Sequence, residues 1–131
     1  MKPNYSFLVI EDNVIYQVIT SKLLKKVSGV QEVSIANNGK EGIHWLHNYH
    51  AKQDEILIIL LDIKMPVMDG FGFLTEYENL KEELKKQTQI FILSSTLNID
   101  EINRGNNNQH VKNVLSKPLP FEAFSEMIQL N

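Results

Sequence analysis

The sequence predicts an α/β fold in which a parallel five-stranded sheet has helices on both faces. Continuous apolar runs of strand length occupy residues 7–10, 56–61 and 90–93, a pattern typical of strands buried on both faces of a parallel sheet. Two more mixed runs, at 30–36 and 111–116, are typical of strands nearer an edge. Helical spacings separate the runs, so that strand and helix alternate five times, as in a right-handed (βα)5 arrangement.

The first half of the chain provides two strands and two helices. The strand at 7–10 stops at Glu11 and Asp12, and an apolar stripe then predicts a helix that packs on the core through Ile15, Ile19 and Leu23. After the alternating strand at 30–36, a second helix is predicted from Ile43 and Leu46.

The second half begins with the most apolar strand, 56–61. One helix is then predicted from a spacing of 4, 3 and 4 residues through Phe73, Tyr77, Leu80 and Leu84. After the strand at 90–93, a short helix would contain Ile99 and Ile102, with Asn98 or Asp100 as its cap, and 103–110 would be a polar loop. The strand at 111–116 and a last helix with Phe121, Phe124 and Ile128 complete the pattern.

Length and composition predict one domain, residues 1–131, with an ordinary globular core. Hydrophobic residues make up 43% and charged residues 22% of the chain. The net charge of −3 argues against binding to nucleic acid or to an anionic membrane surface. The chain has no cysteine, which excludes disulfides and thiolate chemistry, and no apolar run approaches the roughly 20 residues of a membrane span, so we expect a cytoplasmic protein.

Polar residues follow the predicted strands where a site is expected. In open α/β sheets the site lies beyond the carboxyl ends of the strands. Helix capping explains any one strand-end acid, but it does not explain why so many charged and hydroxyl groups meet at one edge. These residues are Glu11, Asp12, Asp62, Ser94 and Lys117.

The chemistry of this set points to a divalent cation and a phosphate group. Three carboxylates in one crevice repel one another unless a positive charge lies among them, and all-oxygen ligation suits Mg²⁺. An aspartate can act as a nucleophile and form an aspartyl phosphate. Asp62 is the best candidate because it follows a buried strand, with Lys117 and Ser94 available to neutralise or bind phosphoryl oxygens.

The whole pattern resembles the receiver domain of response regulators, the phosphoacceptor module of two-component signalling. The resemblance is carried by residues 7–13, 36–42 and 116–119 and, most specifically, by the Asp-x-x-Met-Pro-x-Met-Asp-Gly loop at 62–70. It implies a doubly wound, flavodoxin-like three-layer sandwich with strand order 2-1-3-4-5, which brings Asp12 and Asp62 together.

The resemblance also implies a role for each site residue. Asp62 would accept a phosphoryl group from a histidine kinase or a histidine phosphotransfer protein. Ser94 would hydrogen-bond that group and shift on activation, and Lys117 would bind a phosphoryl oxygen. Mg²⁺ would be held by Glu11, Asp12, Asp62 and the backbone carbonyl of Lys64.

The resemblance assigns significance to four further features. Val114 stands where many receivers carry an aromatic readout residue. Lys64 and Thr96, two residues after Asp62 and Ser94, occupy positions that modulate the lifetime of the phosphate. The peptide bond between Lys117 and Pro118 would be cis.

The function predicted from these residues is a stand-alone phosphorylation switch with no output domain. We expect it to signal through contacts with an effector protein, as a monomer or a weak phosphorylation-dependent dimer. It is not expected to be an enzyme beyond limited self-phosphorylation and autodephosphorylation.

Other functions remain open at this point. A phosphorelay shuttle would have the same site, and the chain could be a receiver excised from a hybrid kinase. A phosphatase of the haloacid dehalogenase type also uses an Asp with Mg²⁺, but it needs a second Asp where this chain has Lys64. A flavodoxin-like flavin carrier needs a hydroxyl- and Gly-rich loop, where this chain has Glu11 and Asp12.

Overall fold

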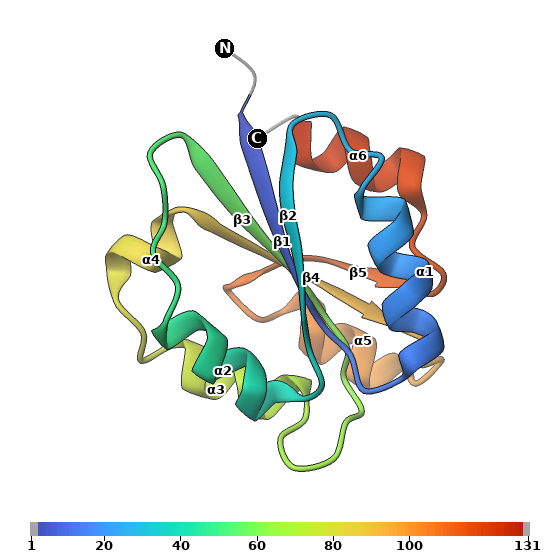
Figure 1. Ribbon diagram of the computed structural model, residues 1–131. Helices are drawn as coiled ribbons and strands as arrows, with labels where there is room; N and C mark the ends of the chain where they lie inside the picture. Colours follow the sequence, from blue (N-terminus) through green and yellow to red (C-terminus); the bar gives the residue numbers. More distant parts are fainter. Residues whose placement is uncertain (1–2, 130–131) are drawn as a thin grey trace.

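A computed structural model of the chain describes residues 3–129. The five strands form one parallel sheet in the order β2-β1-β3-β4-β5, which confirms the predicted fold (Figure 1). In chain order the elements are β1 (Asn4–Ile10), α1 (Val14–Leu24), β2 (Val30–Ala36), α2 (Gly39–His47), β3 (Glu55–Leu61), α3 (Gly70–Tyr77), α4 (Glu82–Lys86), β4 (Thr88–Ser94), α5 (Ile99–Asn106), β5 (Val111–Ser116) and α6 (Phe121–Gln129).

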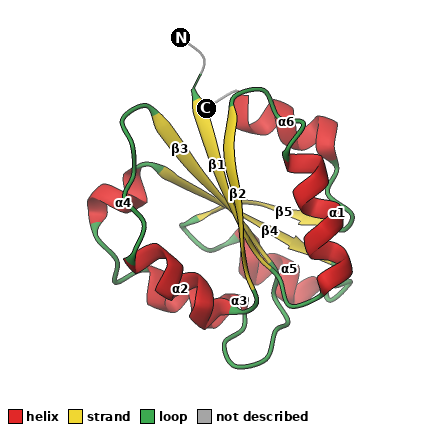
Figure 2. Cartoon of the chain, in the orientation of Figure 1, coloured by secondary structure: helices red, strands yellow, loops and turns green. Residues whose placement is uncertain are grey.

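The sheet separates two hydrophobic cores, because alternate strand residues point to opposite faces. Figure 2 shows helices on both faces of the sheet. On one face, Leu8 and Ile10 pack with Phe73 of α3 and Leu46 of α2. On the other face, a second set of strand side chains packs with α1 and α6. The sheet and the helices on its two faces thus form the three layers of a doubly wound fold.

Helix α1 follows the sequence prediction only at Leu23, which packs on the core, and differs from it at Ile15 and Ile19. Ile15 is 68% exposed and Ile19 is also exposed, whereas Gln17 and Thr20 are buried against the sheet. The prediction was wrong at Ile15 and Ile19 because the buried face of the helix near the site carries Gln17, whose amide donates to the Glu11 carbonyl at 2.6 Å. The N-terminal part of the apolar stripe of α1 is therefore left on the surface.

The segment predicted as a third helix is two helices. Helix α3 ends at Tyr77, and the chain turns at 78–81 before α4 begins. The Leu80 N–H donates to the Tyr77 carbonyl, a spacing of three residues that tightens and closes the last turn. The predicted polar loop was also too long, since α5 continues to Asn106 and leaves only 107–110 as the connection to β5.

The loop between β3 and α3 runs close against the end of β3. A side chain on Gly70 would overlap the Asp62 carbonyl, and the Gly70 N–H donates to the Ile63 carbonyl at 2.8 Å. Val67, at the tip of the loop, has a φ of 72°, which is unusual for a β-branched residue. After β5, the peptide bond between Lys117 and Pro118 is cis, as the resemblance implies.

The start of β1 and the end of α6 lie next to each other at the end of the sheet opposite this loop. The Tyr5 hydroxyl donates to the Ile128 carbonyl at 3.3 Å. In Figure 1, β1 begins and α6 ends at the top of the molecule, and the loop between β3 and α3 lies at the bottom. Within residues 3–129, no helix is both long and apolar enough to cross a membrane.

Candidate functional site

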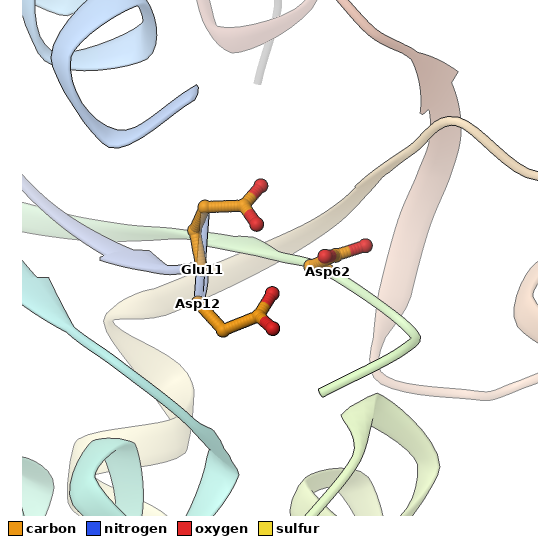
Figure 3. A group of neighbouring side chains, drawn as sticks. All are labelled: Glu11, Asp12 and Asp62. Atoms are coloured by element: carbon orange, nitrogen blue, oxygen red, sulfur yellow. The ribbon is translucent and has the colours of Figure 1, made fainter. Parts of the chain in front are cut away.

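Three carboxylates gather where β1 and β3 end. Glu11 and Asp12 follow β1, and Asp62 follows β3. A carboxylate oxygen from each lies within 4.8 Å of the others, and in the described part of the chain this is the group of acids and histidines that could hold a metal ion. Figure 3 shows the Glu11 and Asp12 side chains extending toward Asp62. The register explains the meeting, since Ile10 and Leu61 are paired neighbours in the sheet.

Lys117 brings a positive charge into this cluster from the end of β5. Its Nζ lies 2.5 Å from Glu11 Oε1 and 3.3 Å from Asp62 Oδ2. The Lys117 side chain is only 4% exposed, so these ion pairs are largely shielded from solvent. The remaining Asp62 oxygen, Oδ1, accepts a hydrogen bond from the Ile63 N–H at 2.8 Å.

The electrostatics of the cluster leave it short of positive charge. Burial raises the pKa of Glu11 to about 7, and the negative charge of Asp62 acts in the same direction. Hydrogen bonds from Lys117 and from the Asn13 N–H oppose this rise in pKa. One lysine therefore does not fully offset three neighbouring carboxylates.

Mg²⁺ fits the residues present. The available ligand atoms at this edge are carboxylate oxygens, which are the ligands that Mg²⁺ prefers. Glu11 and Asp62 are buried and Asp12 is exposed, which leaves one side of the cluster open to water and to a further ligand.

The predicted hydroxyl and modulating residues line the same hollow. A cavity of about 540 Å³ lies over the acidic cluster, and the loop after β4 forms its opposite wall. Ser94 is buried and its Oγ accepts a hydrogen bond from the Thr96 N–H at 3.2 Å. The predicted site residues that line this cavity are Glu11, Asp12, Asp62, Lys64, Ser94, Thr96 and Lys117.

Val114 lies outside this cavity, in the layer beneath α5. It is partly buried and packs on the core shared with α3. A side chain on Gly105 of α5 would come within 2.9 Å of Val114 Cγ2, so α5 lies directly on β5 at this point.

The sequence prediction missed three residues that support the site. The ring of Tyr16 lies 4.3 Å from Lys117 Nζ, a cation–π contact. The Gln17 amide bridges the Glu11 carbonyl and the side chain of Asn37. Tyr16 and Gln17 lie within six residues of Glu11, but only the orientation of α1 distinguishes them from its other residues.

Glu101 is a fourth missed residue, on the first turn of α5. Its Oε1 accepts a hydrogen bond from the Thr96 hydroxyl at 2.7 Å and lies 3.9 Å from Lys64 Nζ. An acidic residue in the first turn is a common way to stabilise a helix, so its position alone gave no signal of a contact with the site.

Comparison with known proteins identifies relatives along the whole chain. A family model of the response regulator receiver domain matches residues 7–129. The solved response regulator receiver protein of Dyadobacter fermentans has a TM-score of 0.86 and 28% sequence identity, with 96% of each chain covered.

Two curated relatives are much longer proteins. A protein-glutamate methylesterase/protein-glutamine glutaminase of Desulfotalea psychrophila is 37% identical over 79 residues, which are 60% of this chain and 20% of that protein. The hybrid signal transduction histidine kinase K of Dictyostelium discoideum is 29% identical over 127 residues, which are 94% of this chain and 10% of that protein. This chain thus spans about a fifth and a tenth of their lengths.

The family match, the strand order and the acidic cluster agree with one another. Receiver domains are in general signalling switches rather than enzymes. The chain belongs to the response regulator receiver domain family of two-component signalling.

Proposed function

We propose that this protein is a phosphorylation switch whose phosphoacceptor is Asp62. The observation that carries the proposal is the buried Asp62 carboxylate at the exit of a central strand, 3.3 Å from the Lys117 ammonium group and open to a cavity. A nucleophile for phosphoryl transfer needs such a fixed position beside a positive charge.

In the proposed reaction an Asp62 oxygen forms a bond to phosphorus while the bond from phosphorus to a histidine nitrogen of the donor protein breaks. The nitrogen leaves with the electron pair. Lys117 neutralises the charge on the phosphoryl oxygens, and the buried Ser94 hydroxyl donates a hydrogen bond to one of them. Both groups line the same cavity as Asp62.

Mg²⁺ is the proposed cofactor of this transfer. Glu11, Asp12, Asp62 and the backbone carbonyl of Lys64 would hold it. When bound, the ion neutralises negative charge on the carboxylates and on the phosphoryl group. Three carboxylates beside the single ammonium group of Lys117 support an added cation at this end of the sheet.

The proposed partners are a histidine kinase or a histidine phosphotransfer protein and an effector. Large apolar side chains surround the mouth of the cavity, where a docking protein would cover them. Leu97 is 94% exposed on the loop after β4, and Val14 and Ile15 are exposed at the start of α1. A switch and a phosphorelay shuttle share this surface, and the rate of phosphate loss separates them.

The test is the mass of the intact protein after incubation with Mg²⁺ and acetyl phosphate. We expect the wild type to gain one labile phosphoryl group and Asp62→Asn to gain none. The matched control is Asp69→Asn in the same loop, because an asparagine side chain can still accept the capping hydrogen bond from the Gly72 N–H. This variant should be labelled like the wild type.

Either of two results would overturn the proposal. If a known receiver is labelled under the same conditions and this protein is not, Asp62 is not a phosphoacceptor. Labelling of the wild type that persists in Asp62→Asn would likewise assign the reaction to another residue.

A further inference from the structure

A chain of polar contacts connects the phosphoacceptor side of the cavity to helix α5. The Thr96 N–H donates to Ser94 Oγ, and the Thr96 hydroxyl donates to Glu101 Oε1 at 2.7 Å. The same carboxylate oxygen lies 3.9 Å from Lys64 Nζ. We call these four residues, Ser94, Thr96, Glu101 and Lys64, the Glu101 latch.

Further contacts fix the middle of the latch. The Thr96 hydroxyl oxygen also accepts a hydrogen bond from the Asn98 N–H at 3.1 Å. The Asn98 side chain in turn caps α5 by accepting from the Glu101 N–H at 3.1 Å. The loop after β4 and the first turn of α5 therefore form one hydrogen-bonded unit with Glu101 at its centre.

Helix α5 depends on this unit because its apolar anchoring is weak. Gly105 is its one buried residue, and Ile99 is 65% exposed at its start. At its other end, the Arg104 guanidinium lies 3.9 Å above the Phe71 ring. With little buried apolar surface, the position of the first turn is set mainly by polar contacts.

A phosphoryl group on Asp62 would compete directly with Glu101 for Lys64, and it would act on the Thr96 contact of Glu101 indirectly, through Ser94. Lys64 is two residues from Asp62, and its side chain is 76% exposed and thus free to reorient toward added negative charge. Ser94 Oγ lies in the same cavity as Asp62 and is held in place by the Thr96 N–H. Movement of either group weakens the contacts that Glu101 makes.

We propose that Glu101 is a positioning residue that holds α5 in its unphosphorylated arrangement through its contacts with Thr96 and Lys64, so that these contacts oppose binding of a phosphoryl group at Asp62. This inference rests on the proposed function of Asp62. Because linkage is reciprocal, a contact that stabilises the unphosphorylated arrangement also weakens binding of a phosphoryl group by the same factor.

The test uses beryllofluoride with Mg²⁺, a probe that binds a carboxylate as a phosphoryl group does. Its affinity is measured by titration for the wild type and for three variants. Glu101→Ala, which removes both latch contacts, should bind beryllofluoride about three- to tenfold more tightly than the wild type, as expected for the loss of one exposed ion pair and one hydrogen bond. Glu101→Gln keeps an acceptor for Thr96 and should lie between the two.

The matched control is Asp100→Asn, which removes one negative charge from the same turn of α5 next to Glu101. It should bind beryllofluoride like the wild type. A second readout is hydrogen exchange of the α5 amides without beryllofluoride, which should be faster in Glu101→Ala than in the control. Simple loss of structure would weaken beryllofluoride binding rather than strengthen it.

The outcomes separate this inference from the function on which it rests. If the wild type binds beryllofluoride and Glu101→Ala binds it no more tightly than Asp100→Asn does, the Glu101 latch is wrong and the proposed function stands. If the wild type does not bind beryllofluoride at all, the proposed function fails and the latch fails with it.

Discussion

The ammonium group of Lys117 stabilises the acidic cluster in the folded protein. It lies between Glu11 and Asp62, and the ring of Tyr16 covers it on a further side. Removing one partner of a buried ion pair leaves an uncompensated charge, which commonly costs about 3–5 kcal/mol. The cluster is therefore held together by the same lysine that the proposed reaction uses.

Tyr16 is expected to affect the proposed reaction through Lys117. Tyr16→Leu removes the cation–π contact, which is worth about 0.5–1 kcal/mol at a partly exposed site, and should slow labelling by acetyl phosphate about two- to fivefold. Tyr16→Phe keeps the ring and should be labelled at close to the wild-type rate. The measurement is the initial rate of mass gain, with circular dichroism as the check of folding. Equal rates for Tyr16→Leu and the wild type would show that the ring does not orient Lys117.

At this scale the sequence predicted the residues that follow strands and missed those that support them from helices. Glu11, Asp62 and Lys117 could be assigned to one edge because strand ends are readable from apolar runs. Tyr16 and Glu101 act through side-chain directions on helices, which depend on how each helix is rotated against the sheet. The rotation of a helix against the sheet is set by packing, and the spacing of apolar residues in the sequence does not determine it.

Among the helices, α1 shows the limit of an apolar stripe as a guide to burial. Ile15 and Ile19 of its stripe face solvent, and the buried face of the same part of the helix is held by hydrogen bonds of Gln17. Strand β3 was easier to predict because nearly all of its residues are buried and a continuous apolar run has no second interpretation at that length. The break between α3 and α4 was missed because Leu80 still packs on the core beyond the end of α3.

The connection between α5 and β5 is fastened to α3 by a titratable contact. Glu78, just beyond α3, contacts His110 Nε2 and also accepts a hydrogen bond from Gln109 at 3.1 Å. The hydrogen bond with His110 lowers the pKa of Glu78 below its ordinary value. A carboxyl group whose pKa is lowered by folding stabilises the protein above its unfolded-state pKa, and this contribution is lost as the pH falls through the lowered pKa.

The expected result is a stability difference that depends on pH. Glu78→Gln should unfold at a lower urea concentration than the wild type near pH 6, by a small margin because Glu78 is exposed to solvent. The two proteins should converge below the lowered pKa of Glu78, where the wild-type carboxyl group is also uncharged. Urea unfolding at a series of pH values measures this, with Glu76→Gln, an exposed acid on α3, as the control. A difference that stays constant down to pH 3 would contradict the assignment.

For the molecule as a whole, the site depends on the pairing of four strands. Its residues lie at the carboxyl ends of β1, β3, β4 and β5, which are separated by long stretches of chain and come together through parallel pairing. The architecture was predictable because strand and helix alternate throughout and parallel crossovers have one hand.

The hydrogen bond between Tyr5 and Ile128 makes a circular permutation of the chain possible. Since β1 begins beside the end of α6, a short flexible linker could join the two ends, and new ends could be opened between the exposed residues Lys52 and Gln53. Such a circular permutant should fold with the same circular dichroism spectrum and gain a phosphoryl group on Asp62 as the wild type does. Failure to fold would show that the neighbouring ends cannot be bridged without strain. The segment before β3 lies, like the start of β1 and the end of α6, at the end of the sheet away from the acidic cluster, so we expect the new ends to leave the site unchanged.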